Sequence, residues 1–133
     1  MRKSYIAGGL LLASSLLIGQ TDEASLRDSM KKIAPTNGGL GKKIAAKDAS
    51  ASEDAKMLQS LYSDLHKFFT DKKMDDAVGF SDTGTELYGK VSKLVAAGNW
   101  EEAVTEQKKL SATCMGCHSA HREKLPDGSY KMK

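Results

Sequence analysis

The residues best suited to chemistry lie together near the C-terminus, where the chain reads Cys114-Met115-Gly116-Cys117-His118. This Cys-x-x-Cys-His pattern is the attachment signature of c-type haem. Two thiols three residues apart can form thioethers with the two vinyl groups of one porphyrin, and the histidine that follows can supply an axial nitrogen to the iron. On a helix, Cys114 and His118 lie one turn apart and share a face. The motif predicts one covalently attached haem c, held by Cys114 and Cys117, with His118 as an iron ligand.

Three other uses of the cysteines fit the sequence less well. A redox pair is expected at the start of a helix after a strand, and the chain has almost no strand signals. A zinc site could use Cys114, Cys117, His118 and His121, but four ligands within eight residues of one helix rarely surround a metal tetrahedrally. A disulfide across two residues inside a helix is strained. We therefore expect both thiols to be used in thioethers.

The first 20 residues resemble a secretory signal peptide. Arg2 and Lys3 form a basic start, and Ile6 to Ile18 is an uncharged stretch of 13 residues, which is shorter than the ~20 residues of a membrane helix. No clear cleavage motif precedes Asp22, so an uncleaved anchor is the alternative. We expect export, in a bacterium to the periplasm, and no stable membrane association after cleavage.

The remaining chain, residues 21–133, is long enough for one domain. Without Arg2 and Lys3 the net charge falls from +3 to +1. A nucleic-acid-binding protein needs a basic surplus that this chain lacks. Thirteen alanines in residues 21–133 leave a thin apolar core, and small domains of this kind usually need a cross-link or a cofactor for stability.

The first half of this domain predicts helical segments. One begins near Thr21 and is interrupted at Pro35 and the following Asn37-Gly38-Gly39, with a kinked continuation over 40–47. Ser50 to Glu53 fits a capping box for the next helix. That helix has the strongest apolar stripe in the chain, formed by Met57, Leu58, Leu61, Tyr62, Leu65, Phe68 and Phe69.

The second half predicts two more helices. Residues 71–79 are polar and indicate a loop, after which Ser81 or Asp82 could cap a third helix. A fourth helix is expected from Trp100 to about Lys124. Four helices with short polar connections and no strands predict an all-α fold, an antiparallel four-helix bundle.

The segment Cys114–Arg122, CMGCHSAHR, resembles the C-terminal motif of class II c-type cytochromes, the cytochrome c′ group. Arg122 matches the arginine of that pattern, whereas His121 stands where the family usually has tyrosine or phenylalanine. The resemblance implies a left-handed four-helix bundle that encloses one haem, often as a homodimer. The sequence itself leaves dimerisation open, because interface stripes and core stripes look alike.

The family resemblance also directs attention to the first helix, which supplies the residue opposite the proximal histidine. The segment Leu26-Arg27-Asp28-Ser29-Met30 resembles the family's arginine-then-methionine segment, although the spacing is one residue shorter than usual. Met30 is therefore the predicted distal ligand, and core packing is the alternative for a methionine on an apolar stripe. Arg27 and Arg122 are candidates to lie near the cofactor and tune its potential, or to be solvated surface charges.

Two further histidines are weaker candidates. His66 lies outside the apolar stripe of its helix, which favours a surface position over iron ligation. His121 follows His118 by three residues and cannot reach the opposite axial position, but could stack beside the proximal ring or donate to a propionate.

These residues lead to three functional hypotheses. The first is a non-enzymatic periplasmic carrier of single electrons that binds redox protein partners, with Lys31, Lys32, Lys42 and Lys43 as a candidate docking patch. The second is a five-coordinate cytochrome c′ that binds NO or CO and differs only in leaving Met30 unbound. The third, a peroxidase-like enzyme, fits least, because only Arg27 offers a suitable polar group in the first helix.

Overall fold

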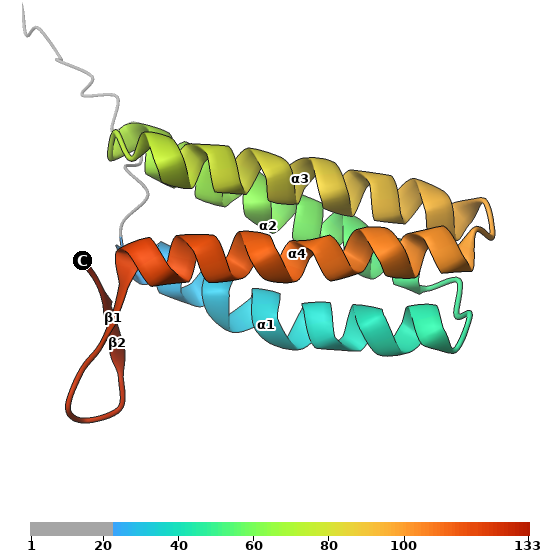
Figure 1. The fold of residues 1–133 in the computed structure, drawn as a ribbon, viewed down its shortest axis with the longest axis horizontal. Coiled ribbons are helices and arrows are strands. Elements are labelled where there is room, and N and C mark those ends of the chain that lie inside the picture. The colour runs from blue at the N-terminus through green and yellow to red at the C-terminus, as the bar shows by residue number, and fades with distance from the viewer. Residues whose placement is uncertain (1–22) are drawn as a thin grey trace, which may run out of the picture.

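The computed structural model describes residues 23–133, and the predicted signal peptide lies outside them. Four helices pack side by side, each antiparallel to the next along the chain (Figure 1). They are α1 (Glu23–Ala45), α2 (Ala51–Asp71), α3 (Asp75–Ala96) and α4 (Trp100–His121). Loops of three to five residues allow only antiparallel neighbours. The predicted all-α four-helix bundle is confirmed.

All three loops between the helices begin with the same C-terminal capping motif. Lys47, Lys73 and Gly98 each adopt a positive φ just after a helix. In each case the residue that follows donates its N–H to a carbonyl five residues earlier, as in Asn99 to Leu94 at 2.9 Å. This Schellman arrangement satisfies carbonyls that the helix end would otherwise leave unpaired.

The predicted interruption of the first helix is wrong, because α1 continues through Pro35 as one helix to Ala45. Proline removes one backbone hydrogen bond and disfavours a helix interior. Ile33 precedes Pro35 in the helix, Leu40 and Ile44 follow it, and all three are buried against the other helices. Burial on both sides of the proline therefore outweighs the local preference for a break.

The predicted start of the third helix is also wrong. α3 begins at Asp75, six residues before Ser81, so the loop expected over 71–79 is confined to residues 72–74. Asp75 and Asp76 lie in the first turn, where carboxylates interact favourably with the helix dipole. Ala77 and Ser81 are buried, so the segment interpreted as a polar loop belongs to the packed bundle.

A short β-hairpin follows α4 and was not predicted. α4 ends at His121 rather than near Lys124, and β1 (Arg122–Lys124) pairs antiparallel with β2 (Tyr130–Met132). At the turn, Gly128 has a φ of 85°. The Asp127 carboxylate accepts hydrogen bonds from the backbone and hydroxyl of Ser129. The hairpin folds back so that Met132 lies beside Arg122 at the end of α4.

Apolar side chains from all four helices form one core. Tyr88, Phe68, Leu40 and Leu58 are among its fully buried members. The prediction that Met57 belongs to this core is wrong, because Met57 is 53% exposed while the adjacent Leu58 is fully buried. The apolar stripe of α2 is therefore narrower than its sequence indicates.

Substituting Gly84 by alanine should destabilise the bundle. The ring of Tyr62 packs on the α3 backbone at Gly84, where a Cβ would collide with ring carbons Cδ1 and Cε1. Overpacking of this kind costs about 1–3 kcal/mol. At Gly79 on the same helix a Cβ meets nothing within 4 Å. Gly79→Ala is therefore expected to raise the free energy of unfolding by about 0.5–1 kcal/mol.

Urea denaturation of both purified variants, followed by circular dichroism, measures this difference. A Gly84→Ala protein as stable as the Gly79→Ala protein would show that Tyr62 does not need the space at Gly84.

Candidate functional site

A cavity of about 760 Å³ opens at the end of the bundle where α1 begins, α4 ends and the hairpin folds back. Sites for small molecules and cofactors typically enclose roughly 300–1,000 Å³ and have mainly apolar walls. Every helix and the hairpin contribute to this one. Its larger apolar wall residues are Leu26, Met30, Ile33, Tyr62, Leu65, Phe69, Phe80, Leu125 and Met132. The cavity can therefore accommodate a mostly apolar group of cofactor size.

The Cys-x-x-Cys-His motif lies in the wall of this cavity. Cys114, Cys117 and His118, all from the last two turns of α4, line it, and neither cysteine is in a disulfide. Burial raises the pKa of the Cys117 thiol, and the nearby Asp76 carboxylate adds to this effect. The three side chains predicted to hold a cofactor are thus brought together on one surface, as expected for residues one turn apart.

The surroundings of His118 favour its neutral form. Partial burial lowers its pKa, and the Arg122 charge nearby lowers it further. Both effects favour the neutral imidazole at pH 7. The neutral form is the one that binds a metal, because the ligating nitrogen must be unprotonated.

Gly116, between the two cysteines, allows α3 to approach α4 closely. An added Cβ there would lie 2.6 Å from Cε1 of Phe80. Phe80 also lines the cavity, so this contact places an aromatic wall next to the motif. A side chain at position 116 would push Phe80 from its place.

Met30 lines the same cavity from α1. It is partly buried and packs against the core cluster. Met132, in the C-terminal hairpin, also lines the cavity and packs against this cluster, because the hairpin folds back onto the bundle. Two thioether side chains are therefore available at this site.

The predicted arginines lie at the cavity as well. Arg27 is largely exposed and pairs with Glu23 at 3.6 Å, while the Arg122 guanidinium stacks over the ring of Tyr130 at 4.1 Å. Both arginines line the cavity together with Lys31 and Lys131. The lining thus contains four cationic side chains and the Glu23 carboxylate, and Lys131 pairs with Glu123 at 3.4 Å.

His121 and His66 hold different positions. His121 lines the cavity, and its Nε2 lies 2.7 Å from a carboxylate oxygen of Asp76, a contact that holds the pKa of Asp76 below its usual value. His66 does not line the cavity; its side chain is 40% exposed and its Nδ1 lies 2.7 Å from Asp82. This position agrees with the expected surface placement.

The zinc alternative finds no support in the described part of the chain. Within residues 23–133, no three His, Cys, Asp or Glu side chains are grouped so that they could hold a metal ion. Cys114, Cys117, His118 and His121 share a helix face but do not converge on one point.

Sequence reasoning missed the polar residues at the inner end of the cavity. Tyr62 and Asn37 line it, and Tyr88 and Gln107 pack directly behind them. Burial raises the pKa of both tyrosines, so their hydroxyls stay protonated. One signal was present: Asn37 follows Met30 by seven residues and so lies on the same face of α1.

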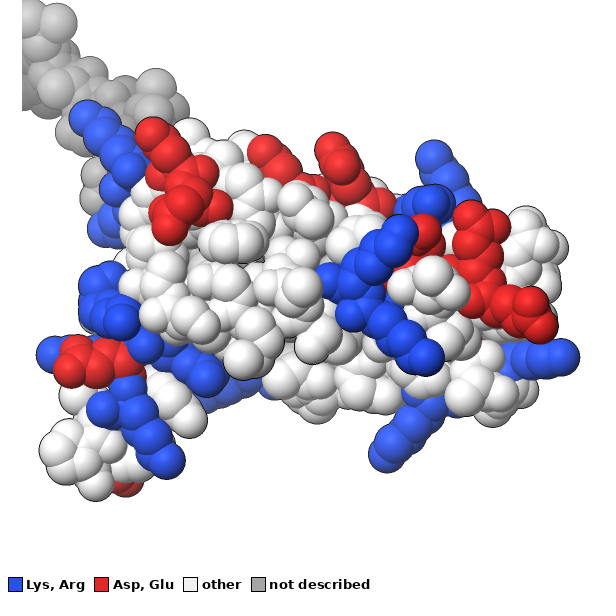
Figure 2. Space-filling view, in the orientation of Figure 1, with Lys and Arg blue, Asp and Glu red and all other residues white. Residues whose placement is uncertain are grey.

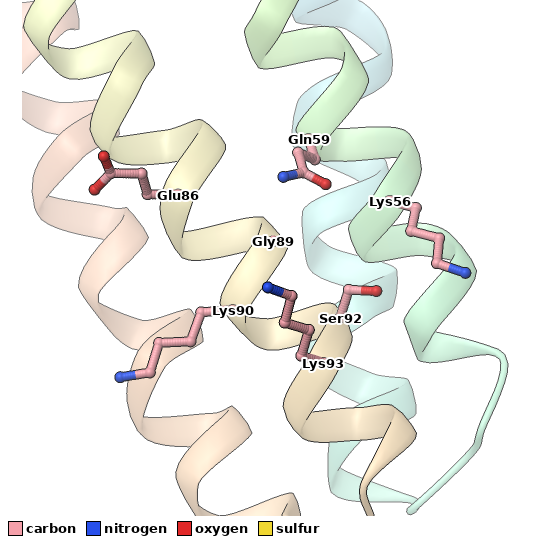
Figure 3. Close-up of a pocket in the computed structure, with 7 residues that line it drawn as sticks. All are labelled: Lys56, Gln59, Glu86, Gly89, Lys90, Ser92 and Lys93. Atoms are coloured by element: carbon pink, nitrogen blue, oxygen red, sulfur yellow. The ribbon is translucent and has the colours of Figure 1, made fainter.

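A second hollow, of about 480 Å³, lies between α2 and α3. Its wall is made mostly of surface side chains, with the buried Ser92 among them, and Lys56 and Lys90 point to opposite sides of it (Figure 3). Gly89 forms the floor on α3. These groups do not face a common point, so the hollow offers no site for chemistry.

No protein-family model, curated protein or solved structure matches this chain. Within residues 23–133 no helix has the length and apolar character needed to span a membrane. The site is therefore interpreted from its own residues: a four-helix bundle with a Cys-x-x-Cys-His motif in the wall of an apolar cavity.

Proposed function

We propose that this protein is a monohaem c-type cytochrome that carries single electrons. The observation that carries the proposal is that Cys114, Cys117 and His118 line one cavity of suitable size and apolar character, which Met30 lines from another helix. The two cysteines would hold the haem through thioethers, with His118 as the proximal and Met30 as the distal ligand. A haem held in this way supplies one-electron Fe(III)/Fe(II) chemistry.

The residues around the site suit this role. A thioether is a soft ligand that favours ferrous iron and so raises the reduction potential. Leu65, Phe69 and Phe80 would exclude water from the site, which also affects potential. Arg27 and Arg122 at the entrance add positive charge, which favours the reduced state or pairs with propionates.

Binding of NO or CO by a five-coordinate iron is the second candidate. Leu26 and Ile33 flank Met30 on α1 and line the same cavity. If the Met30 sulfur stays unbound, these apolar side chains would cover an open iron position. Enzymatic chemistry has less support, because no histidine among the described residues joins Met30 and Arg27 on the α1 wall of the cavity.

For an electron carrier, the partner is another redox protein. The predicted docking patch divides into two parts, because Lys42 and Lys43 lie at the far end of α1 and Lys43 pairs with Asp54 at 2.8 Å. Lys31 instead lies at the cavity entrance with Lys131. Several Lys and Arg side chains lie at this hairpin end in Figure 2. We propose periplasmic docking of an acidic partner surface here, after removal of residues 1–20.

Covalent haem is the decisive test. The full chain, produced in a bacterial periplasm that attaches c-type haem, is expected to retain one haem per chain after denaturation and organic extraction. Mass spectrometry should find the mass of one haem on the peptide that contains Cys114 and Cys117, and no alkylatable thiol. Cys114→Ser and Cys117→Ser should each keep one thioether, and the double variant should lose all haem on extraction.

The Met115→Leu variant is the matched control, because position 115 is exposed and lies within the motif without carrying its chemistry. It should retain both thioethers. Two alkylatable thiols in the wild-type protein, or one bound zinc ion, would overturn the proposed function.

A further inference from the structure

One buried hydroxyl contacts the motif and has no role in the function proposed above. The Tyr62 hydroxyl lies 3.3 Å from Sγ of Cys114, and Tyr62 is 6% exposed. The same hydroxyl also interacts with the neighbouring Tyr88 side chain. Within residues 23–133, Cys117 has no comparable hydroxyl contact. The two motif cysteines are therefore held differently by the fold.

The position of Tyr62 is fixed from several sides. Its ring packs on the α3 backbone at Gly84 and meets the ring of Tyr88 edge-on, with 5.2 Å between centroids. Tyr88 in turn donates a hydrogen bond to Oδ1 of Asn37 at 3.1 Å, and Gln107 donates to the same oxygen at 3.3 Å. This cluster joins all four helices at the inner end of the cavity. Tyr62 thus has little freedom to move away from Cys114.

We propose that Tyr62 is a positioning residue: once haem occupies the cavity and the bundle packs around it, Tyr62 holds the Cys114 sulfur for thioether formation and so favours attachment at this cysteine. This inference rests on the proposed function. In the bond-forming step the Cys114 thiol adds across a vinyl group. The sulfur bonds to one vinyl carbon, the vinyl π bond breaks, and the thiol hydrogen ends on the other vinyl carbon. The addition consumes no oxidant or reductant.

The hydrogen bond between Tyr62 and Cys114 persists after attachment, and its donor and acceptor are then fixed. In the free thiol either the phenol or the sulfur can be the donor. A thioether sulfur carries no hydrogen and can only accept, so the Tyr62 hydroxyl must then donate to it. Turning away from Cys114 would cost the buried hydroxyl this hydrogen bond, and this favours keeping Tyr62 directed at Cys114.

The test compares attachment at the two cysteines without accessory proteins. The full chain, with its thiols reduced, is mixed with haem and a reductant, and samples are quenched over time and alkylated. Peptide mass spectrometry then reports the thioether fraction at Cys114 and at Cys117 separately. Tyr62→Phe is expected to slow attachment at Cys114 about fivefold, the change in rate that corresponds to the loss of one hydrogen bond. The rate of attachment at Cys117 should stay unchanged.

Tyr62→Phe keeps the ring against Gly84, so the packing is retained, and Cys117 serves as an internal reference within each sample. Tyr88→Phe is the matched control, since it removes the neighbouring hydroxyl and its bond to Asn37 but not the contact with Cys114. It should slow attachment at Cys114 less than Tyr62→Phe does, because the ring at position 88 still packs edge-on against Tyr62. Equal slowing at both cysteines would assign Tyr62 a structural role only, and a wild-type chain that forms no Cys114 thioether under these conditions would also overturn the inference. The proposed function stands or fails separately, on covalent haem in the protein from the periplasm.

Discussion

Replacing Met30 by alanine is expected to change the iron from six-coordinate and low-spin to five-coordinate and high-spin. Met30 lines the cavity from α1 and His118 lines it from α4, so the two side chains would hold the proposed haem iron from different helices. Alanine has no donor atom, and the iron position that Met30 would hold would open to added ligands. The oxidised variant should lose the absorption band of a sulfur–iron bond, and the reduced variant should bind CO. Its reduction potential should fall by on the order of 0.1 V, part of the roughly 0.8 V range set by axial ligands.

Met132→Leu is the matched control, because Met132 also lines the cavity and packs on the same core cluster. Leucine keeps the volume of the side chain and removes only the sulfur. This variant should retain the low-spin spectrum and fail to bind CO. Loss of the low-spin spectrum in Met132→Leu but not in Met30→Ala would make the hairpin methionine the ligand. A wild-type protein that is already high-spin and binds CO would instead favour the gas-binding candidate.

The helices could be predicted because their apolar stripes repeat with a helical period, but their ends could not. Gly98 marks the end of α3, as a glycine in a left-handed cap usually does. Lys47 and Lys73 adopt the same conformation without that signal. The sequence therefore predicts a longer loop before α3 than the three residues found in the structure. The reverse occurred at Pro35, where a strong local signal for a break is overridden by burial on both sides.

The candidate site, too, could be predicted from the sequence only in part. The order of Cys114, Cys117 and His118 is local, so their common face follows from helix geometry alone. The partnership of Tyr62 with Cys114 joins residues 52 positions apart. In the sequence, Tyr62 looks like any other member of the α2 stripe. The hairpin was missed because its strands are only three residues long and exposed, without the alternation that indicates a strand.

The haem-free chain is expected to lose its fixed tertiary packing. A cavity of about 760 Å³, at roughly 24 cal/mol per Å³, corresponds to an upper limit of about 18 kcal/mol, because the value applies to closed cavities and this one opens to solvent. Domains are stable by only about 5–15 kcal/mol. Even part of that cost would leave the empty bundle unfolded or molten, and the alanine-rich composition provides little apolar area elsewhere to offset it.

The loss of tertiary packing in the haem-free chain should differ between the two ends of the bundle. Leu40, Leu58, Val91 and Leu110 are fully buried and do not line the cavity, so their half of the bundle keeps a packed core. Hydrogen exchange should therefore show residual protection around these residues and almost none in residues 113–133 or the first turns of α1. The full chain produced without haem attachment should keep helical circular dichroism, bind a hydrophobic dye and unfold without a sharp transition.

Adding haem to the same preparation is the control, and it should restore cooperative unfolding and uniform protection. A haem-free chain with sharp, cooperative unfolding and even protection would contradict this prediction. It would mean that the walls of the cavity can collapse onto one another, and the cavity would then no longer indicate a missing group. We expect instead that the walls of the empty cavity cannot close. Tyr62 is held against Gly84, and Phe80 lies against Gly116, so two of the aromatic walls rest on helix backbones and have no space to move inward.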